Sequence, residues 1–168
     1  VASYLNTLIR NADAVTMANM AQLVNVIAPI FTSPEGLFLQ TIFYPLLMHA
    51  EHRGTIALDA HGESDAFAAL GQDVNYVDTA ATYDDATGAV YIHAVNLHRD
   101  QAATLRVGGD VAAPDTGVSV WEIRGASPAT MNSFDHPDAV TLTHHTRADP
   151  RVIELAPCSA NTIAVFLR

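Results

Sequence analysis

Four histidines of this sequence stand at spacings that could suggest a metal ion. His49 and His52 are three residues apart near the end of a predicted helix, so both side chains could reach one ion, but no third ligand stands at a motif spacing from them. His144 and His145 are neighbours in a predicted strand, and they therefore point to opposite faces and cannot chelate together. We predict no metal site and interpret the first pair as solvent-exposed histidines.

One thiol and two aromatic side chains could also take part in a site. Cys158 is the only cysteine, which excludes an internal disulfide, and without a partner histidine in the sequence we predict a buried thiol. Trp121 and Tyr91 could stack against a sugar ring, but aromatic residues in a strand pattern belong more often to the core. None of these residues by itself defines an activity.

The elements that must position these residues begin with an almost uncharged segment. Between residues 14 and 50 the only formal charge is Glu35, so we predict that this segment is buried. Polar residues within it, among them Gln22 and Asn25, rule out one uninterrupted membrane span.

Helical spacing of apolar residues predicts two helices in this first part of the chain. They cover residues 1–11 and 39–52, with Pro45 in the first turn of the second helix, and a turn at 32–36 precedes that helix. Residues 14–22 are short and apolar, and they fit a buried strand or a buried helix equally well.

From Gly54 onward the hydrophobic period drops to two, which is typical of strands. The eight predicted strands cover residues 54–59, 76–83, 89–97, 102–107, 117–124, 139–145, 151–155 and 161–167. Two hairpins are expected among them, one joining 76–83 to 89–97 and one joining 89–97 to 102–107. Long loops are expected at 60–75 and 125–138. Such spacing favours an antiparallel sandwich or jelly roll.

The predicted fold class is therefore mixed, in two domains. Residues 1–52 would form the helix–strand–helix end of a (β/α)8 barrel, and residues 53–168 an all-β antiparallel sandwich or jelly roll. The formal net charge of −10 comes without a basic cluster, so neither nucleic acid nor an anionic membrane is an expected partner. The single cysteine and the absence of a secretory pattern at the first residues favour a cytoplasmic location.

Two sequence motifs carry a resemblance to a known family. AQLVNVIAPI at 21–30 and QTIFYPLLMHA at 40–50 resemble the stretch that closes the catalytic barrel of α-L-arabinofuranosidases of glycoside hydrolase family 51. The preceding YLNTLIRNADAV looks like the helix that leads into the last barrel strand. AVNLHRD, NSFDHPDAV and PCSANTIAVFLR continue the likeness through the terminal sandwich.

The resemblance implies a retaining glycosidase that releases terminal α-L-arabinofuranosyl units from arabinan or arabinoxylan oligosaccharides, without a cofactor, as a homo-oligomer. Its two catalytic glutamates follow an asparagine and precede a tryptophan in the barrel. Neither pair occurs in this sequence, so none of its glutamates is assigned to catalysis and the catalytic pair is expected upstream. The glutamates present are Glu35, Glu51, Glu63, Glu122 and Glu154.

Gln22 is the one residue to which the resemblance gives a role. It matches the glutamine of the AQLVN motif that hydrogen-bonds the arabinofuranose next to the nucleophile, and a primary amide suits sugar hydroxyls without adding charge. If residues 14–22 form the eighth barrel strand, Gln22 lies at its C-terminal end, the catalytic face of such barrels. The alternative is a core glutamine bonded to backbone groups. Asn25 is interpreted as a turn or cap residue.

Two other classes of function stay open on the sequence. The β domain could be a stand-alone carbohydrate-binding or structural module with the first fifty residues as a docking helix pair, or the chain could belong to another barrel glycosidase with the same ancillary sandwich.

Overall fold

The computed structural model describes residues 1–112 and 117–167 of the chain. The two helices are α1 (Ala2–Arg10) and α2 (Phe43–Glu51). The strands are β1 (Ile30–Ser33), β2 (Gly36–Leu39), β3 (Ile56–Leu58), β4 (Ala66–Ala69), β5 (Gln72–Asn75), β6 (Val77–Asp84), β7 (Ala89–Asn96), β8 (Ala103–Arg106), β9 (Val111–Ala112), β10 (Val118–Arg124), β11 (Leu142–Arg147), β12 (Val152–Leu155) and β13 (Ser159–Leu167).

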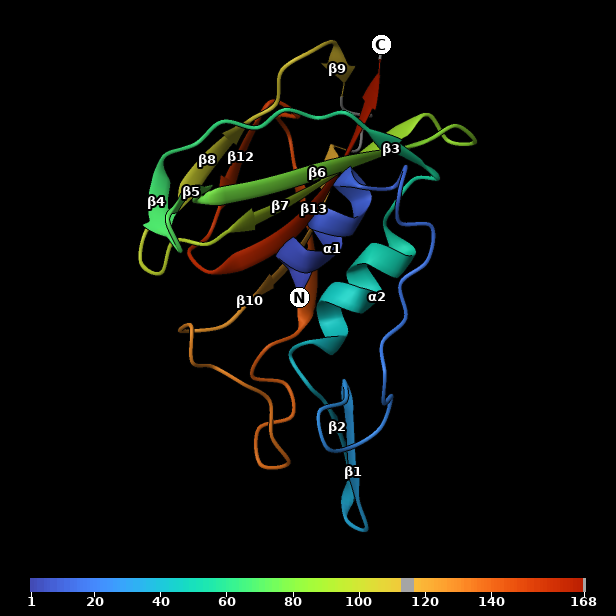
Figure 1. Ribbon diagram of the computed structural model, residues 1–168, viewed down its shortest axis with the longest axis vertical. Helices are drawn as coiled ribbons and strands as arrows, with labels where there is room; N and C mark the ends of the chain where they lie inside the picture. The colour runs from blue at the N-terminus through green and yellow to red at the C-terminus, as the bar shows by residue number, and fades with distance from the viewer. Residues whose placement is uncertain (113–116, 168) are drawn as a thin grey trace.

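A seven-stranded antiparallel sheet forms the centre of the molecule (Figure 1). Its strand order is β11-β10-β13-β7-β6-β3, and β9 pairs with the end of β13. The central strand β13 pairs with β7 on one side and β10 on the other. It is buried from Ser159 to Val165, because both faces of the sheet are covered at this point.

One face of the large sheet packs against a short pair of strands, β8 and β12. Ile153 and Leu155 of β12 lie against Val90 of β7 and Val165 of β13, and all four side chains are buried. Alternate residues of each strand point to opposite faces, so these positions supply the apolar side of a β sandwich.

The other face packs against the two helices, which lie in front of the sheet in Figure 1. Ala2 of α1 and Met48 of α2 contact a buried cluster that includes Ile123 of β10 and Ala160 of β13. Pro45 stands in the first turn of α2, where it costs no internal helix hydrogen bond, as predicted. Among the residues described, no helix has the length and apolar character needed to cross a bilayer.

The eight strands predicted from the period-two pattern are all present, which confirms the antiparallel sandwich. The first predicted hairpin is confirmed by the pairing of β6 with β7. The second is wrong, because β8 leaves the large sheet and pairs with β12 instead. The loop predicted at 60–75 also contains a hairpin of its own, β4–β5.

The buried strand or helix predicted for residues 14–22 is not formed within this structure. The segment 15–20 forms neither helix nor strand, and every residue from 11 to 24 is exposed rather than buried. A strand needs a neighbour to satisfy its backbone N–H and C=O groups, and the part of the chain that the structure describes places none beside this segment. The helix–strand–helix end of a barrel is therefore not seen in the structure.

Gly54, which connects α2 to β3, has no room for a side chain. A Cβ at this position would meet the backbone carbonyl of Tyr83 and the backbone nitrogen of Asp84, and the Gly54 N–H donates to Thr82 Oγ1 at 2.8 Å. We expect Gly54→Ala to lower the free energy of unfolding by at least about 1 kcal/mol, the lower end of the cost of overpacking. Urea denaturation measures this change.

The matched control is Gly108→Ala, because a Cβ at Gly108 meets no atom within 4 Å. This variant is expected to unfold at the same urea concentration as the parent chain. Equal stability losses in the two variants would contradict the close approach of β6 to Gly54.

Candidate functional site

Gln22 lies in an exposed and unusually shaped turn. Its backbone adopts a left-handed conformation with φ 57°, and Asn25 and Val26 follow with φ 59° and 61°. A β-branched residue such as Val26 is rarely left-handed, and strained turns of this kind cluster at functional sites. The Gln22 side chain is exposed, and among the described residues no hydrogen bond holds its amide. The bonded core glutamine of the alternative is thus not seen among the described residues.

Asn25 is a turn residue, as predicted. Its side-chain Oδ1 accepts the Thr32 backbone N–H at 2.8 Å, and its Nδ2 donates to Thr32 Oγ1 at 3.1 Å. The Asn25 backbone N–H donates to the Ile30 carbonyl at 2.8 Å. These bonds tie the turn that carries Gln22 to hairpin β1–β2, whose tip is the predicted turn at 32–36.

An exposed apolar stretch surrounds Gln22. Met17 is 76% exposed, Leu23 65% and Ile27 71%. Scattered apolar residues are normal on a protein surface, but here they follow one another along a single segment.

His49 and His93 form a stacked pair between the helices and the large sheet. The prediction of a solvent-exposed side chain is therefore wrong for His49. The His49 ring is buried and stacks on the ring of His93 with 4.4 Å between centroids. His49 Nδ1 donates to the Pro45 carbonyl at 2.9 Å, and Nε2 lies 3.2 Å from Asn6 Oδ1. The reason for the difference is that the His49 side of α2 faces the large sheet.

His93 is the most perturbed titratable group of the described residues. Burial, and secondarily the neighbouring His49 and His52, lower the pKa of His93 to about 3. Its Nδ1 is 2.9 Å from Thr162 Oγ1, whereas its Nε2 is buried without a hydrogen-bond partner. The ring is thus held neutral inside the helix–sheet interface, where it has a packing role.

His52, the residue after α2, is half-buried and its ring stacks on Trp121 with 3.8 Å between centroids. The ring of His144 also lies near Trp121, with 5.1 Å between centroids. The Trp121 ring therefore packs against two imidazoles, which agrees with the prediction of a structural aromatic residue. Within the described ranges, no group of three potential ligands is placed to hold a metal ion.

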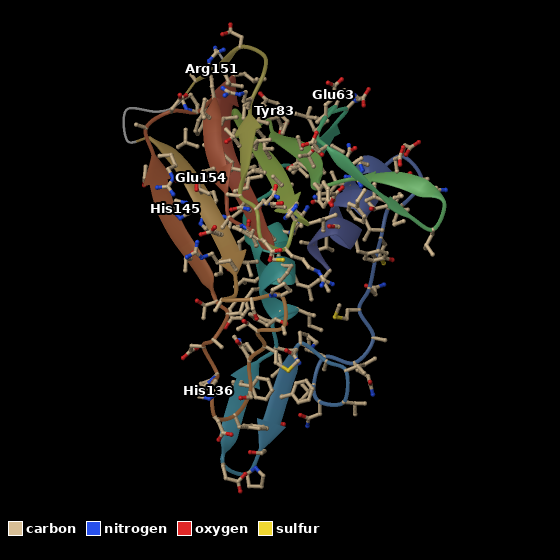
Figure 2. All side chains as sticks on the ribbon, turned by 90° about the vertical axis from the view of Figure 1, so that its left-hand side faces the viewer. Glu63, Tyr83, His136, His145, Arg151 and Glu154 are labelled. Carbon is tan, nitrogen blue, oxygen red and sulfur yellow. The ribbon has the colours of Figure 1, made fainter. Side chains whose placement is uncertain are left out.

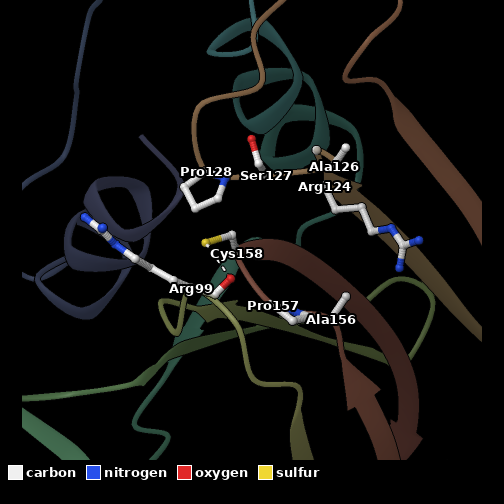
Figure 3. Close-up of a pocket in the computed structure, with 9 residues that line it drawn as sticks. Arg99, Arg124, Ala126, Ser127, Pro128, Ala156, Pro157 and Cys158 are labelled. Carbon is white, nitrogen blue, oxygen red and sulfur yellow. Dashed lines mark hydrogen bonds between the residues drawn. The ribbon is translucent and has the colours of Figure 1, made fainter.

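Cys158 lines a surface pocket of about 430 Å³ and is half-buried, so the prediction of a buried thiol is wrong. Figure 3 shows its sulfur between Pro128 and the Arg99 side chain, and Arg124 extends to the other side. The position is open because Cys158 occupies the turn between β12 and β13, with φ 47°, instead of either strand.

The glutamates lie where the sequence predicted them, in a turn, at a helix end, in a loop and in two strands. Glu35 is at the tip of hairpin β1–β2, and Glu51 ends α2. Figure 2 shows Glu63 and Glu154 on separate parts of the molecule. No catalytic role is assigned to any of them.

An antiparallel sheet with helices on one face and a short strand pair on the other defines this chain as a β-sandwich domain. Comparison with known families then identifies it more closely. The chain belongs to the family of α-L-arabinofuranosidase C-terminal domains, whose model matches residues 1–159. The resemblance to glycoside hydrolase family 51 found in the sequence is thereby confirmed.

Individual relatives agree with this assignment. An intracellular exo-α-(1→5)-L-arabinofuranosidase from Halalkalibacterium halodurans is 43% identical over 109 residues, which cover 63% of this chain and 22% of that protein. The α-L-arabinofuranosidase from Thermotoga maritima, solved as an arabinose complex, is 25% identical with a TM-score of 0.82, covering 99% of this chain and 37% of that one. A family 51 α-L-arabinofuranosidase from Bifidobacterium longum is 27% identical with a TM-score of 0.81, covering 99% of this chain and 34% of that one. The match thus spans about a fifth to just over a third of the length of these proteins.

Sequence reasoning missed the buried side of the helix–sheet interface. Asn6 and His93 are fully buried and belong to it, although neither was selected from the sequence. The period-two pattern of 89–97 was a usable signal, since it places His93 on the same face as Tyr91 and opposite Val90. Which element covers that face was not predictable from the spacing.

Proposed function

We propose that this chain is the C-terminal part of an intracellular retaining α-L-arabinofuranosidase, which hydrolyses terminal non-reducing α-L-arabinofuranosyl residues of arabinan or arabinoxylan oligosaccharides. The catalytic glutamates belong to an upstream barrel of the same protein. The observation that carries the proposal is the family match over residues 1–159, together with relatives whose names specify intracellular exo-arabinofuranosidases.

The exposed apolar stretch supports an upstream partner within the same protein. Residues 15–27 carry apolar side chains on an extended segment that this chain leaves uncovered. In our proposal residues 14–22 pair with the upstream barrel as its last strand, residues 1–52 close that barrel, and residues 53–168 are the ancillary sandwich.

The exposed position of Gln22 supports its assignment as a substrate contact. Its amide offers two donors and an acceptor, and the residue is exposed in a turn with a left-handed backbone. The site needs no cofactor, since glycoside hydrolysis of this type uses two carboxyl groups and water. We propose that the enzyme works as a homo-oligomer, which light scattering of the full-length protein tests.

The direct test compares the full-length protein with the chain of residues 1–168. The full-length protein is expected to release the aglycone from 4-nitrophenyl α-L-arabinofuranoside and not from the corresponding arabinopyranoside, with retention at the anomeric carbon in an NMR time course. The chain of residues 1–168 alone is expected to be inactive on both substrates. Hydrolysis by this shorter chain, or a preference for the pyranoside, would contradict the proposal.

A further inference from the structure

A loop of the sandwich reaches the hairpin that follows Gln22. Figure 2 shows the loop that carries His136 beside hairpin β1–β2 at the lower end of the molecule. This loop covers residues 125–141 and joins β10 to β11. The hairpin lies far earlier in the sequence, since Leu39 and Asn132 are 93 positions apart. We call the residues 125–141 the strut loop.

Asn132 makes the polar contact between the strut loop and the hairpin. Its side chain is 2% exposed, and Nδ2 donates to the Leu39 carbonyl of β2 and to the Val140 carbonyl, both at 2.8 Å. Its Oδ1 accepts the Val140 backbone N–H at 2.7 Å. The buried amide therefore uses both donors and its acceptor, and removal of the side chain would leave buried backbone groups unpaired.

Phe134, two residues further along, makes the apolar contact with the same strand. Its ring meets the ring of Phe38 edge-on at 4.8 Å between centroids, and Phe38 stacks on Phe31 of β1 at 5.1 Å. Phe38 is buried although it lies in a two-stranded hairpin. Since an isolated hairpin is marginally stable in water, the strut loop supplies the surface that holds β1 and β2 in place.

The hairpin in turn fixes the turn that carries Gln22. Asn25 bonds Thr32 through its side chain, Val24 pairs with Ile30, and the Gln40 N–H donates to the Pro29 carbonyl at 2.8 Å. Because of these hydrogen bonds, a displacement of β2 would also move the backbone next to Gln22.

We propose that Asn132 is a positioning residue of the sugar site, which acts through hairpin β1–β2 on Gln22. The inference rests on the proposed function, because it requires that Gln22 contacts the arabinofuranosyl ring. It assigns to the sandwich domain a part in substrate positioning, carried by one buried amide and supported by the Phe134 ring.

The experiment uses the full-length enzyme and four variants, Gln22→Ala, Asn132→Ala, the double variant and a control. The control is Asn96→Ala, because Asn96 is also an almost fully buried asparagine, with its Nδ2 within hydrogen-bond distance of three backbone carbonyls, but it lies in β7, away from the hairpin. Both Asn132→Ala and Asn96→Ala are expected to lower the melting temperature. In assays well below the melting temperature, Asn132→Ala is expected to lower kcat/KM by about tenfold, whereas Asn96→Ala leaves it unchanged. The apparent pKa values of the pH–rate profile are expected to stay the same in both variants.

The double variant separates failure of this inference from failure of the proposed contact. If Asn132 acts through Gln22, Asn132→Ala changes kcat/KM less than about twofold when Gln22 is already alanine. If Gln22→Ala alone has no effect, the proposed sugar contact is wrong. If Gln22→Ala is impaired but Asn132→Ala matches Asn96→Ala, or the two losses multiply independently, the positioning role of Asn132 is wrong.

A second variant keeps the test decisive if Asn132→Ala does not fold. Phe134→Leu retains an apolar side chain but removes the edge-on ring contact with Phe38. It is expected to lower kcat/KM in the same Gln22-dependent manner by a smaller factor, and an unchanged kcat/KM in this variant would overturn the inference.

Discussion

Replacement of Gln22 by alanine in the full-length enzyme is expected to lower kcat/KM about 5- to 150-fold. The range corresponds to a loss of about 1–3 kcal/mol of transition-state stabilisation, the cost of removing one partner from a hydrogen bond in a site shielded from water. Because the Gln22 side chain is exposed and contributes to no packed core of this chain, the melting temperature is expected to stay almost unchanged. Steady-state kinetics on an aryl arabinofuranoside and a thermal denaturation curve measure both quantities.

The control for this variant is Gln72→Ala. Gln72 is also exposed, but it lies in hairpin β4–β5, apart from the turn of Gln22. Its replacement is expected to leave both kcat/KM and the melting temperature unchanged. The sugar contact is refuted if Gln22→Ala is as active as Gln72→Ala, or if its activity falls only in step with its stability.

Acidification is expected to destabilise the chain through His93. Burial lowers the pKa of His93 from its ordinary 6.5 to about 3. Below pH 6.5 the unfolded chain therefore binds a proton at this ring, whereas the folded chain does not. The contribution of this neutral ring to stability is complete above pH 6.5 and is lost as the pH falls from 6.5 toward 3. Between about pH 7.5 and pH 5 the loss from His93 amounts to about 2 kcal/mol. Urea denaturation at a series of pH values measures it.

The variant His93→Gln isolates this contribution. It removes the titration of this ring, and it is expected to flatten the dependence of stability on pH. If His93→Gln does not fold, the NMR titration of the His93 ring in the parent chain serves instead. A parent-like slope in His93→Gln, or a ring that titrates near pH 6.5, would show that His93 is not held neutral by burial.

The strands of the sandwich were predictable because their information is local. Residues 77–84 and 89–96 alternate in polarity or carry β-branched and aromatic residues, and the turn between them contains Gly88, which adopts φ 72°. Alternation fixes which residues share a face, and a short turn fixes which strands pair. The second hairpin failed because the connection from β7 to β8 permits pairing within the large sheet or in the opposing layer, and side-chain packing against β12 decides between them.

The candidate site was predictable only in part. The AQLVN motif selected Gln22, and the preference of asparagine for turns gave the role of Asn25, but the apolar composition of 14–22 gave a buried strand or helix that the structure does not contain. The apolar composition of a segment indicates that it favours burial, but it does not say which other part of the protein covers it. For the same reason His49 was taken as exposed, although its neighbour in space is His93, forty-four residues later in the sequence.

By itself the sequence determined the antiparallel strands, the two helices and the family, since each of these depends on residues close together in the chain. The tertiary structure alone decided which layer each strand joins, the burial of His49 and His93, and the contact of Asn132 with β2. These features depend on pairs of groups far apart in sequence, whose free energy appears only when folding has brought them together and excluded water from between them.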